Sequence, residues 1–171
     1  MSNNGNGSVD TRARLATAQW VLERHLAWIA AAEVKVGVIV ALDTAMLGGL
    51  AAAFGTSDPA ARIVWTYLFT LVAAGATVLG LCCAAMAVMP RTSGPQNSLL
   101  FFGQVASLKA EYYQKALSSV SDEQLLEDWA SQIHRNAEIA CQKYSWVRKS
   151  MGWSFFAVIP LITAIGLLVK L

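Results

Sequence analysis

The chain has 171 residues, of which 56% are hydrophobic and only 14% are charged, and its formal net charge is +2. This composition is too apolar for an ordinary soluble domain, and the length is too short for several independent cores, so a small membrane protein with several spans is expected. Because this net charge is near balance, nothing in the composition argues for a nucleic-acid-binding surface, which would need Lys and Arg clustered on one face.

The first 33 residues divide into a polar tail and an amphipathic segment. Residues 1–10 are polar and lack the basic-then-apolar order of a signal peptide, so we predict a disordered tail. Residues 11–33 carry apolar side chains at steps of three and four, which predicts an amphipathic helix. This helix either packs against another cytosolic helix or lies at the membrane interface.

Two apolar segments follow, at 34–54 and 63–89, and each is long enough to cross a bilayer. The polar turn GTSDPA between them predicts a transmembrane hairpin over 34–89. The first span has small residues on one face, where another helix can approach closely. These helix-packing residues are Gly37, Ala41, Ala45, Gly48 and Ala52.

Asp43 lies near the middle of the first predicted span, where a carboxylate costs a few kcal/mol of insertion free energy. It must therefore face the interior of the helix bundle, as a neutral acid bonded to a neighbouring helix, or line a water-filled path. The sequence leaves these two interpretations open.

Residues 90–150 predict a helical hairpin outside the membrane. Prolines and a glycine mark a loop at 90–96, and apolar periodicity predicts a helix over 97–120. Ser121 and Gln124 form a capping-box pattern that starts the second helix. This helix continues into a third predicted span at 151–171, which is uncharged from Met151 to Val169. Pro160 within this span is expected to bend the helix and act as a hinge.

Lys and Arg are concentrated in the N-terminal arm and in the 91–149 segment, so the positive-inside rule places the N-terminus and the hairpin in the cytoplasm. The fold class we predict is an all-α membrane protein with three transmembrane helices, an N-terminal amphipathic helix and a cytosolic helical hairpin that continues into the last span.

No catalytic or metal-binding motif is present in the sequence. The two histidines have no companion ligand at metal spacing, and there is no nucleophile elbow, phosphate-binding glycine loop or HExxH pattern. Cys82 and Cys83 are adjacent within an apolar run, which is not a metal or disulfide spacing. We therefore expect neither an enzyme nor a metal or cofactor site.

Three passages are more informative in combination: RHLAWIAAAEVKVGVIVALDTAML at 24–47, SLLFFGQVASLKAEYY at 98–113, and SDEQLLEDWASQIHRNAEIACQKYSWVRKS at 121–150. Together they resemble the transmembrane effectors of bacterial Pycsar antiphage systems. The resemblance implies a multi-pass protein of the bacterial inner membrane that responds to a cyclic pyrimidine nucleotide, cyclic UMP or cyclic CMP, made by a neighbouring cyclase. It also implies that activation damages the membrane and stops growth of the infected cell.

A site for such a nucleotide needs cations for its phosphate, flat side chains for its pyrimidine and amides for the polar edge of the base. The shared passages supply these groups on segments predicted to be helical, so the nucleotide would bind to helices. The candidates are Arg135, Lys143, Gln132, Asn136, Tyr112, Tyr113 and Trp129. The alternative is that these side chains fill the core of the hairpin or bridge its helices.

We expect the effector to lie in the lipid bilayer as a homo-oligomer assembled through the small residues of the first span. A competing hypothesis is a membrane scaffold whose cytosolic helices dock a partner protein and bind no nucleotide.

Overall fold

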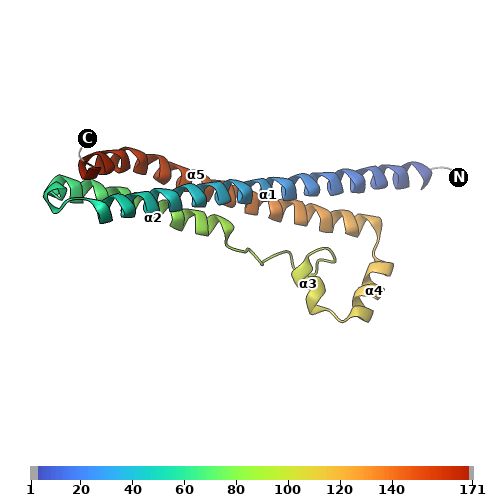
Figure 1. Cartoon of the computed structure of the whole chain (residues 1–171). Helices are drawn as coiled ribbons and strands as arrows, with labels where there is room; N and C mark the ends of the chain where they lie inside the picture. Colours follow the sequence, from blue (N-terminus) through green and yellow to red (C-terminus); the bar gives the residue numbers. More distant parts are fainter. Residues whose placement is uncertain (1–3, 170–171) are drawn as a thin grey trace. The chain divides into compact units, whose positions relative to one another are not determined.

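The computed structural model describes residues 4–169, and every regular element within that range is helical (Figure 1). The elements in chain order are α1 (Asn4–Thr56), the short 3₁₀ helix η1 (Pro59–Ala61), α2 (Val64–Val88), α3 (Phe102–Ser107), α4 (Ala110–Ser119) and α5 (Asp122–Val169). Three of them, α1, α2 and α5, contain stretches long and apolar enough to cross a membrane. The all-α fold with three membrane-spanning helices is thus confirmed.

Contacts divide the chain into two units, and α1 and α5 contribute to both. Residues 31–89 and 142–171 form the three-helix unit, with parts of α1, α2 and α5. Residues 1–30 and 90–141 form the α3–α4 unit, which also includes the first part of each long helix.

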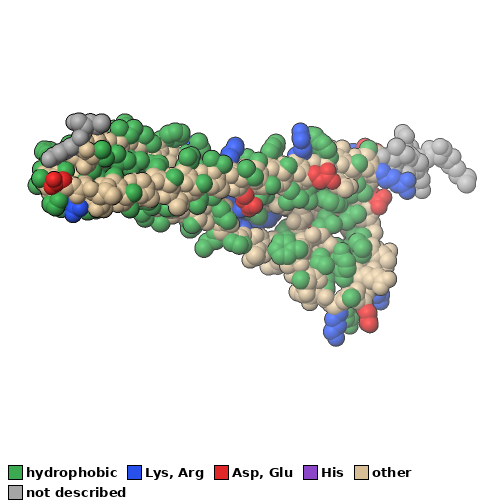
Figure 2. Space-filling view, viewed as in Figure 1, with side chains coloured by type: hydrophobic (Ala, Val, Ile, Leu, Met, Phe, Trp, Pro, Cys, Tyr) green, Lys and Arg blue, Asp and Glu red, His purple; other side chains and the backbone are tan. Residues whose placement is uncertain are grey.

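The three-helix unit is held together by small and branched apolar side chains. One buried cluster contains Ala32, Val36, Ile39, Ala84, Ala87 and Val147, and a second contains Leu50, Ala73, Ala164 and Leu168. The alanines allow close approach of helix backbones, which is how helices pack in lipid. Larger apolar side chains face outward and cover much of the visible surface of this unit, where charges are sparse (Figure 2).

The predicted stripe of small residues does not pack against another helix among residues 4–169. Gly37, Ala41, Ala45, Gly48 and Ala52 are all exposed, whereas the buried residues of α1 lie on its opposite side. A Cβ atom added to Gly37 or Gly48 would meet nothing within 4 Å. The stripe is therefore an unoccupied face of α1, and its role in assembly stays a prediction.

The predicted helix over residues 97–120 needs correction, because the structure divides this region into α3, α4 and a non-helical approach. Ser98 Oγ accepts hydrogen bonds from the backbone N–H groups of Leu100 and Phe101, at 3.1 and 2.9 Å. Such side-chain bonds compete with the helical pattern at the start of a segment. The chain is extended again at Leu108 and Lys109, and α3 and α4 contain no buried residue.

Both long helices extend further than the sequence patterns predicted. Residues 4–10 belong to α1 although we predicted a disordered tail over 1–10, and residues 1–3 lie outside the described range. Extending an existing helix costs little, and the Arg14–Asp10 ion pair, 2.6 Å across one turn, supports its start. α5 continues through Pro160, which is buried, so the hinge at this residue remains untested.

Gly80 of α2 lies close to side chains of both α1 and α5. A Cβ atom here would lie 2.9 Å from Asp43 Oδ2, on α1, and 3.1 Å from Ser154 Oγ, on α5. Both distances are shorter than ordinary contacts, and Asp43 is fully buried. Glycine at this position therefore makes room for the Asp43 carboxyl group.

Replacing Gly80 with Ala should lower the free energy of unfolding by about 1–3 kcal/mol, the usual cost of overpacking. The matched control is Gly75→Ala on the same helix, where a Cβ meets nothing within 4 Å and stability should be equal or higher. Thermal unfolding in detergent, followed by circular dichroism, measures the difference. Equal melting temperatures for the two variants would contradict this packing.

Candidate functional site: a groove beside α5

The connection between α2 and α3 lacks regular structure, and side chains of α5 bind it. Leu99 N–H donates to Asp128 Oδ2 at 2.7 Å, and Gln132 Nε2 donates to Ser98 Oγ at 2.9 Å. One turn further along, Arg135 Nε donates to the carbonyl oxygen of Ser93 at 2.9 Å. Because residues three and four apart share a helix face, α5 presents one row of polar groups to this segment.

A groove of about 280 Å³ lies where this connection meets α1 and α5 within the α3–α4 unit. We call it the Arg135 groove, and it is lined by Leu22, Leu26, Arg91, Ser93, Leu100, Phe101, Phe102, Gln132, Arg135, Asn136 and Ile139. Its lining combines two guanidinium groups, two amides and two aromatic rings. Guanidinium suits phosphate, and apolar rings with a few amides suit a heterocyclic base.

Arg135 is already engaged in the structure, although 27% of its side chain remains exposed. Its Nε and Nη2 atoms donate to Ser93, and its Nη1 donates to Glu138 Oε2 at 2.9 Å. Glu138 is about half exposed, so the carboxylate can leave this pair without losing access to water. An anion entering the groove would compete with Glu138 for the guanidinium.

The structure brings three of the seven predicted ligand-binding residues into this groove: Gln132, Arg135 and Asn136. Gln132 is buried on Ser98, and Asn136 Nδ2 donates to the carbonyl oxygen of Gln132 at 2.9 Å, so both also have structural bonds. These contacts are compatible with a role in ligand binding, and equally with the alternative that these side chains only bridge segments of the hairpin.

The aromatic candidates lie outside the lining of the groove. Tyr113 donates its hydroxyl to the carbonyl oxygen of Leu99 at 3.1 Å, and Trp129 is half-buried. Tyr112 is 66% exposed on α4. The rings that do line the groove are Phe101 and Phe102, with centroids 4.9 Å apart.

Lys143 belongs to the three-helix unit and does not line the groove. It is only 4% exposed, and its Nζ donates to Glu33 Oε1 at 2.8 Å and to the carbonyl oxygen of Ala87 at 3.0 Å. Ala87 lies in the last turn of α2, where carbonyl groups lack helical partners and attract a cation. These contacts make Lys143 a clamp between α1, α2 and α5.

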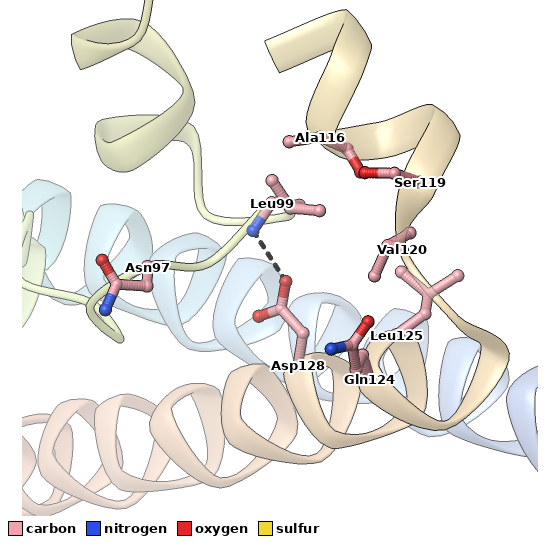
Figure 3. Close-up of a pocket in the computed structure, with 8 residues that line it drawn as sticks. All are labelled: Asn97, Leu99, Ala116, Ser119, Val120, Gln124, Leu125 and Asp128. Atoms are coloured by element: carbon pink, nitrogen blue, oxygen red, sulfur yellow. Dashed lines mark hydrogen bonds between the residues drawn. The ribbon is translucent and has the colours of Figure 1, made fainter. Parts of the chain in front are cut away.

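A second pocket of the α3–α4 unit, of about 440 Å³, lies between the end of α4 and the start of α5 (Figure 3). The Asp128 carboxylate points across it toward Leu99, while Ala116, Ser119 and Val120 lie on the opposite side. Its lining has a carboxylate and no cation, which disfavours phosphate. None of the seven predicted residues lines this pocket.

Among the residues of the Arg135 groove that sequence reasoning missed are Arg91, Ser93 and Phe101. Arg91 and Ser93 lie in the Pro- and Gly-containing loop, whose path no periodic pattern specifies. Phe101 falls within the predicted helix over 97–120, whereas in the structure it precedes α3 in extended conformation. The signal that could have found the groove was Arg91, a cation in a loop next in sequence to the predicted hairpin that carries Arg135. Among the described residues, no three His, Cys, Asp or Glu side chains cluster as metal ligands.

The fold and the groove define a helical membrane protein with several spans and with a groove lined by two arginines. Residues 17–170 match the Pycsar effector protein domain, and the chain belongs to this family of effectors. The family is not an enzyme class.

A curated relative, the Pycsar effector protein PtPycTM of Propioniciclava tarda, is 36% identical over 136 residues. The alignment covers 72% of this chain and 65% of the relative, so the chain spans less than two thirds of that protein's length. No solved structure matches the chain.

Replacing Lys143 with Met should lower the free energy of unfolding by about 1–3 kcal/mol, because the buried charge-assisted bonds to Glu33 and Ala87 disappear. Lys115→Met, at an exposed position of α4, is the control and should leave stability unchanged. Thermal unfolding of both variants in detergent provides the comparison. A K143M protein as stable as the parent would show that the clamp contributes nothing.

Proposed function

We propose that this protein is an antiphage defence effector of the bacterial inner membrane that responds to cyclic UMP or cyclic CMP. On binding the nucleotide it impairs membrane integrity and stops growth of the infected cell. The cyclic nucleotide comes from a neighbouring cyclase, and the N-terminus and the α3–α4 unit lie in the cytoplasm. Family membership and the Arg135 groove support this proposal.

The observation that carries the proposal is the combination of groups in the Arg135 groove. Arg135 and Arg91 provide positive charge for one cyclic phosphate. Phe101 provides an apolar ring face for the pyrimidine, and the amides of Gln132 and Asn136 can read its polar edge. The volume of about 280 Å³ lies just below the usual range for small-molecule sites, about 300–1,000 Å³, so the groove suits only a small ligand such as a single nucleotide.

The Arg135–Glu138 pair supplies a difference between the free and bound states. Without ligand, the guanidinium pairs with Glu138 at 2.9 Å, and a bound phosphate replaces that carboxylate. A ligand shifts a conformational equilibrium only through contacts that differ between the states. Exchange of the partner of Arg135, on the helix that continues to Val169, is such a difference.

The effect on the membrane follows from the continuity of α5 and from assembly. α5 carries both Arg135 and the third membrane span, so a shift in its position reaches the bilayer without an intervening loop. The exposed stripe on α1 offers a surface on which copies of the chain can pack as a homo-oligomer.

Arg135→Ala should abolish nucleotide-dependent dye release from liposomes that contain the purified protein. Glu138→Gln should lower the nucleotide concentration that gives half-maximal release, several-fold, because the competing carboxylate is gone. The measurement adds cyclic UMP, cyclic CMP, cyclic AMP and cyclic GMP separately.

Glu127→Gln provides the matched control, because it removes an exposed acid from the same helix without touching the groove. Its response should equal that of the parent protein. The proposed site is wrong if R135A responds normally, or if E138Q and E127Q shift the response equally. Silence of the folded, inserted parent protein with all four nucleotides would refute the nucleotide response itself.

One observation favours a second candidate function, a scaffold that docks a protein partner. Phe102, Tyr112 and Leu117 expose 66%, 66% and 45% of their surface on α3 and α4, and neither helix contains a buried residue. Large apolar side chains that two neighbouring elements leave exposed are a feature of interaction sites. If the protein is such a scaffold, no nucleotide should raise the melting temperature of the purified protein. The Phe102→Ser and Tyr112→Ser variants should then lose binding to the protein partner.

A further inference from the structure

The three-helix unit contains a fully buried acid that the nucleotide response does not use. Asp43, on α1, is 0% exposed, and its Oδ2 accepts from Ser154 Oγ of α5 at 3.0 Å. Gly80 of α2 lies against the same carboxyl group, and Ser150 Oγ donates to the Gly80 carbonyl oxygen at 2.8 Å. We call Asp43, Gly80, Ser150 and Ser154 the Asp43 cluster.

The carboxyl group is incompletely satisfied. Asp43 Oδ1 is buried and has no hydrogen-bond partner within the described chain. Ser154 Oγ is also 3.0 Å from the carbonyl oxygen of Ser150, so its single proton serves one acceptor at a time. A buried polar atom without a partner costs about 1–3 kcal/mol, and an acid inside a membrane costs more.

Stability of the packed helices does not explain an acid here, because an apolar side chain of similar size would fill the position without that cost. Asp43 is the sole charged residue in the segments 36–56, 64–88 and 150–169. A state in which water reaches the carboxyl group relieves its cost. The acid therefore lowers the free energy of such a hydrated state relative to the packed arrangement that the structure shows.

A groove of about 500 Å³ lies beside the carboxyl group, between α1 and α5, and Asp43 and Ser154 are among its lining residues. The remaining lining is apolar except for Lys35. Separation of α5 from α1 at Ser154 would break the contact with Oδ2 and open the carboxyl group to this groove.

We propose that the Asp43 cluster closes the three-helix unit at rest, and that the ionised Asp43 carboxylate lines a cation-selective path once the contact with Ser154 breaks. The acid releases its proton to the entering water, and the carboxylate then attracts cations, as rings of acidic side chains do in cation channels. This inference rests on the proposed membrane activity and adds the kind of ion that passes.

The experiment records currents across planar bilayers under a KCl gradient, with cyclic UMP and cyclic CMP added separately. The parent protein should open with one nucleotide and show a reversal potential close to that of K⁺. Asp43→Asn should still open, but its reversal potential should move toward zero, because the fixed charge is lost. Thr44→Ala is the control on the same helix. Thr44 is exposed and donates to the carbonyl oxygen of Val40 in its own helix, so selectivity should not change.

A second variant tests the inference without nucleotide. Ser154→Ala removes the donor to Oδ2 and should raise the basal K⁺ leak several-fold, while circular dichroism shows unchanged helix content. If no nucleotide opens the parent but S154A leaks, the proposed nucleotide response fails and the role of the cluster stands. An unchanged leak in S154A, or an unchanged reversal potential in an open D43N protein, overturns the inference.

Discussion

The α3–α4 unit depends on the row of polar side chains that α5 presents to the segment before α3. That segment lacks regular structure, so its backbone groups need partners outside the helical pattern. Asp128, Gln132 and Arg135 provide these bonds at successive turns. Gln132 and Arg135 of this row also line the Arg135 groove. These two side chains therefore bind the segment that forms one wall of the groove, and a ligand that takes one of them as its partner also loosens that wall.

Local patterns were sufficient to predict the fold class and the start of α5. The three membrane spans follow from long uncharged stretches, which need no knowledge of tertiary contacts. The capping box is present as predicted: Gln124 N–H donates to Ser121 Oγ at 3.2 Å, and Ser121 N–H donates to Gln124 Oε1 at 3.0 Å. Such features involve residues within one turn, and the sequence encodes them directly.

The candidate site was predicted only in part, because its geometry depends on contacts between distant residues. Periodicity assigned Phe101 to a helix, but Ser98 and Asp128 bind the backbone beside it and prevent helical bonding. Lys143 lies two turns beyond Arg135 on α5, yet the end of α2 and Glu33 capture it. Charge and spacing identified a helix rich in groups that can bind a ligand. Which of these groups reach the groove depends on hydrogen bonds between residues 34 to 110 positions apart in the sequence.

Lys143 and Asp43 are two buried ionisable residues of the three-helix unit that differ in how they are satisfied. Lys143 donates hydrogen bonds to the Glu33 carboxylate and to the carbonyl oxygen of Ala87, so its charge helps to hold the three helices together. Asp43 has one shared hydroxyl donor and an oxygen with no partner among the described residues. A compensated charge stabilises one arrangement of helices, whereas an uncompensated one favours any arrangement that admits water. The two residues therefore act in opposite directions on the same helix bundle.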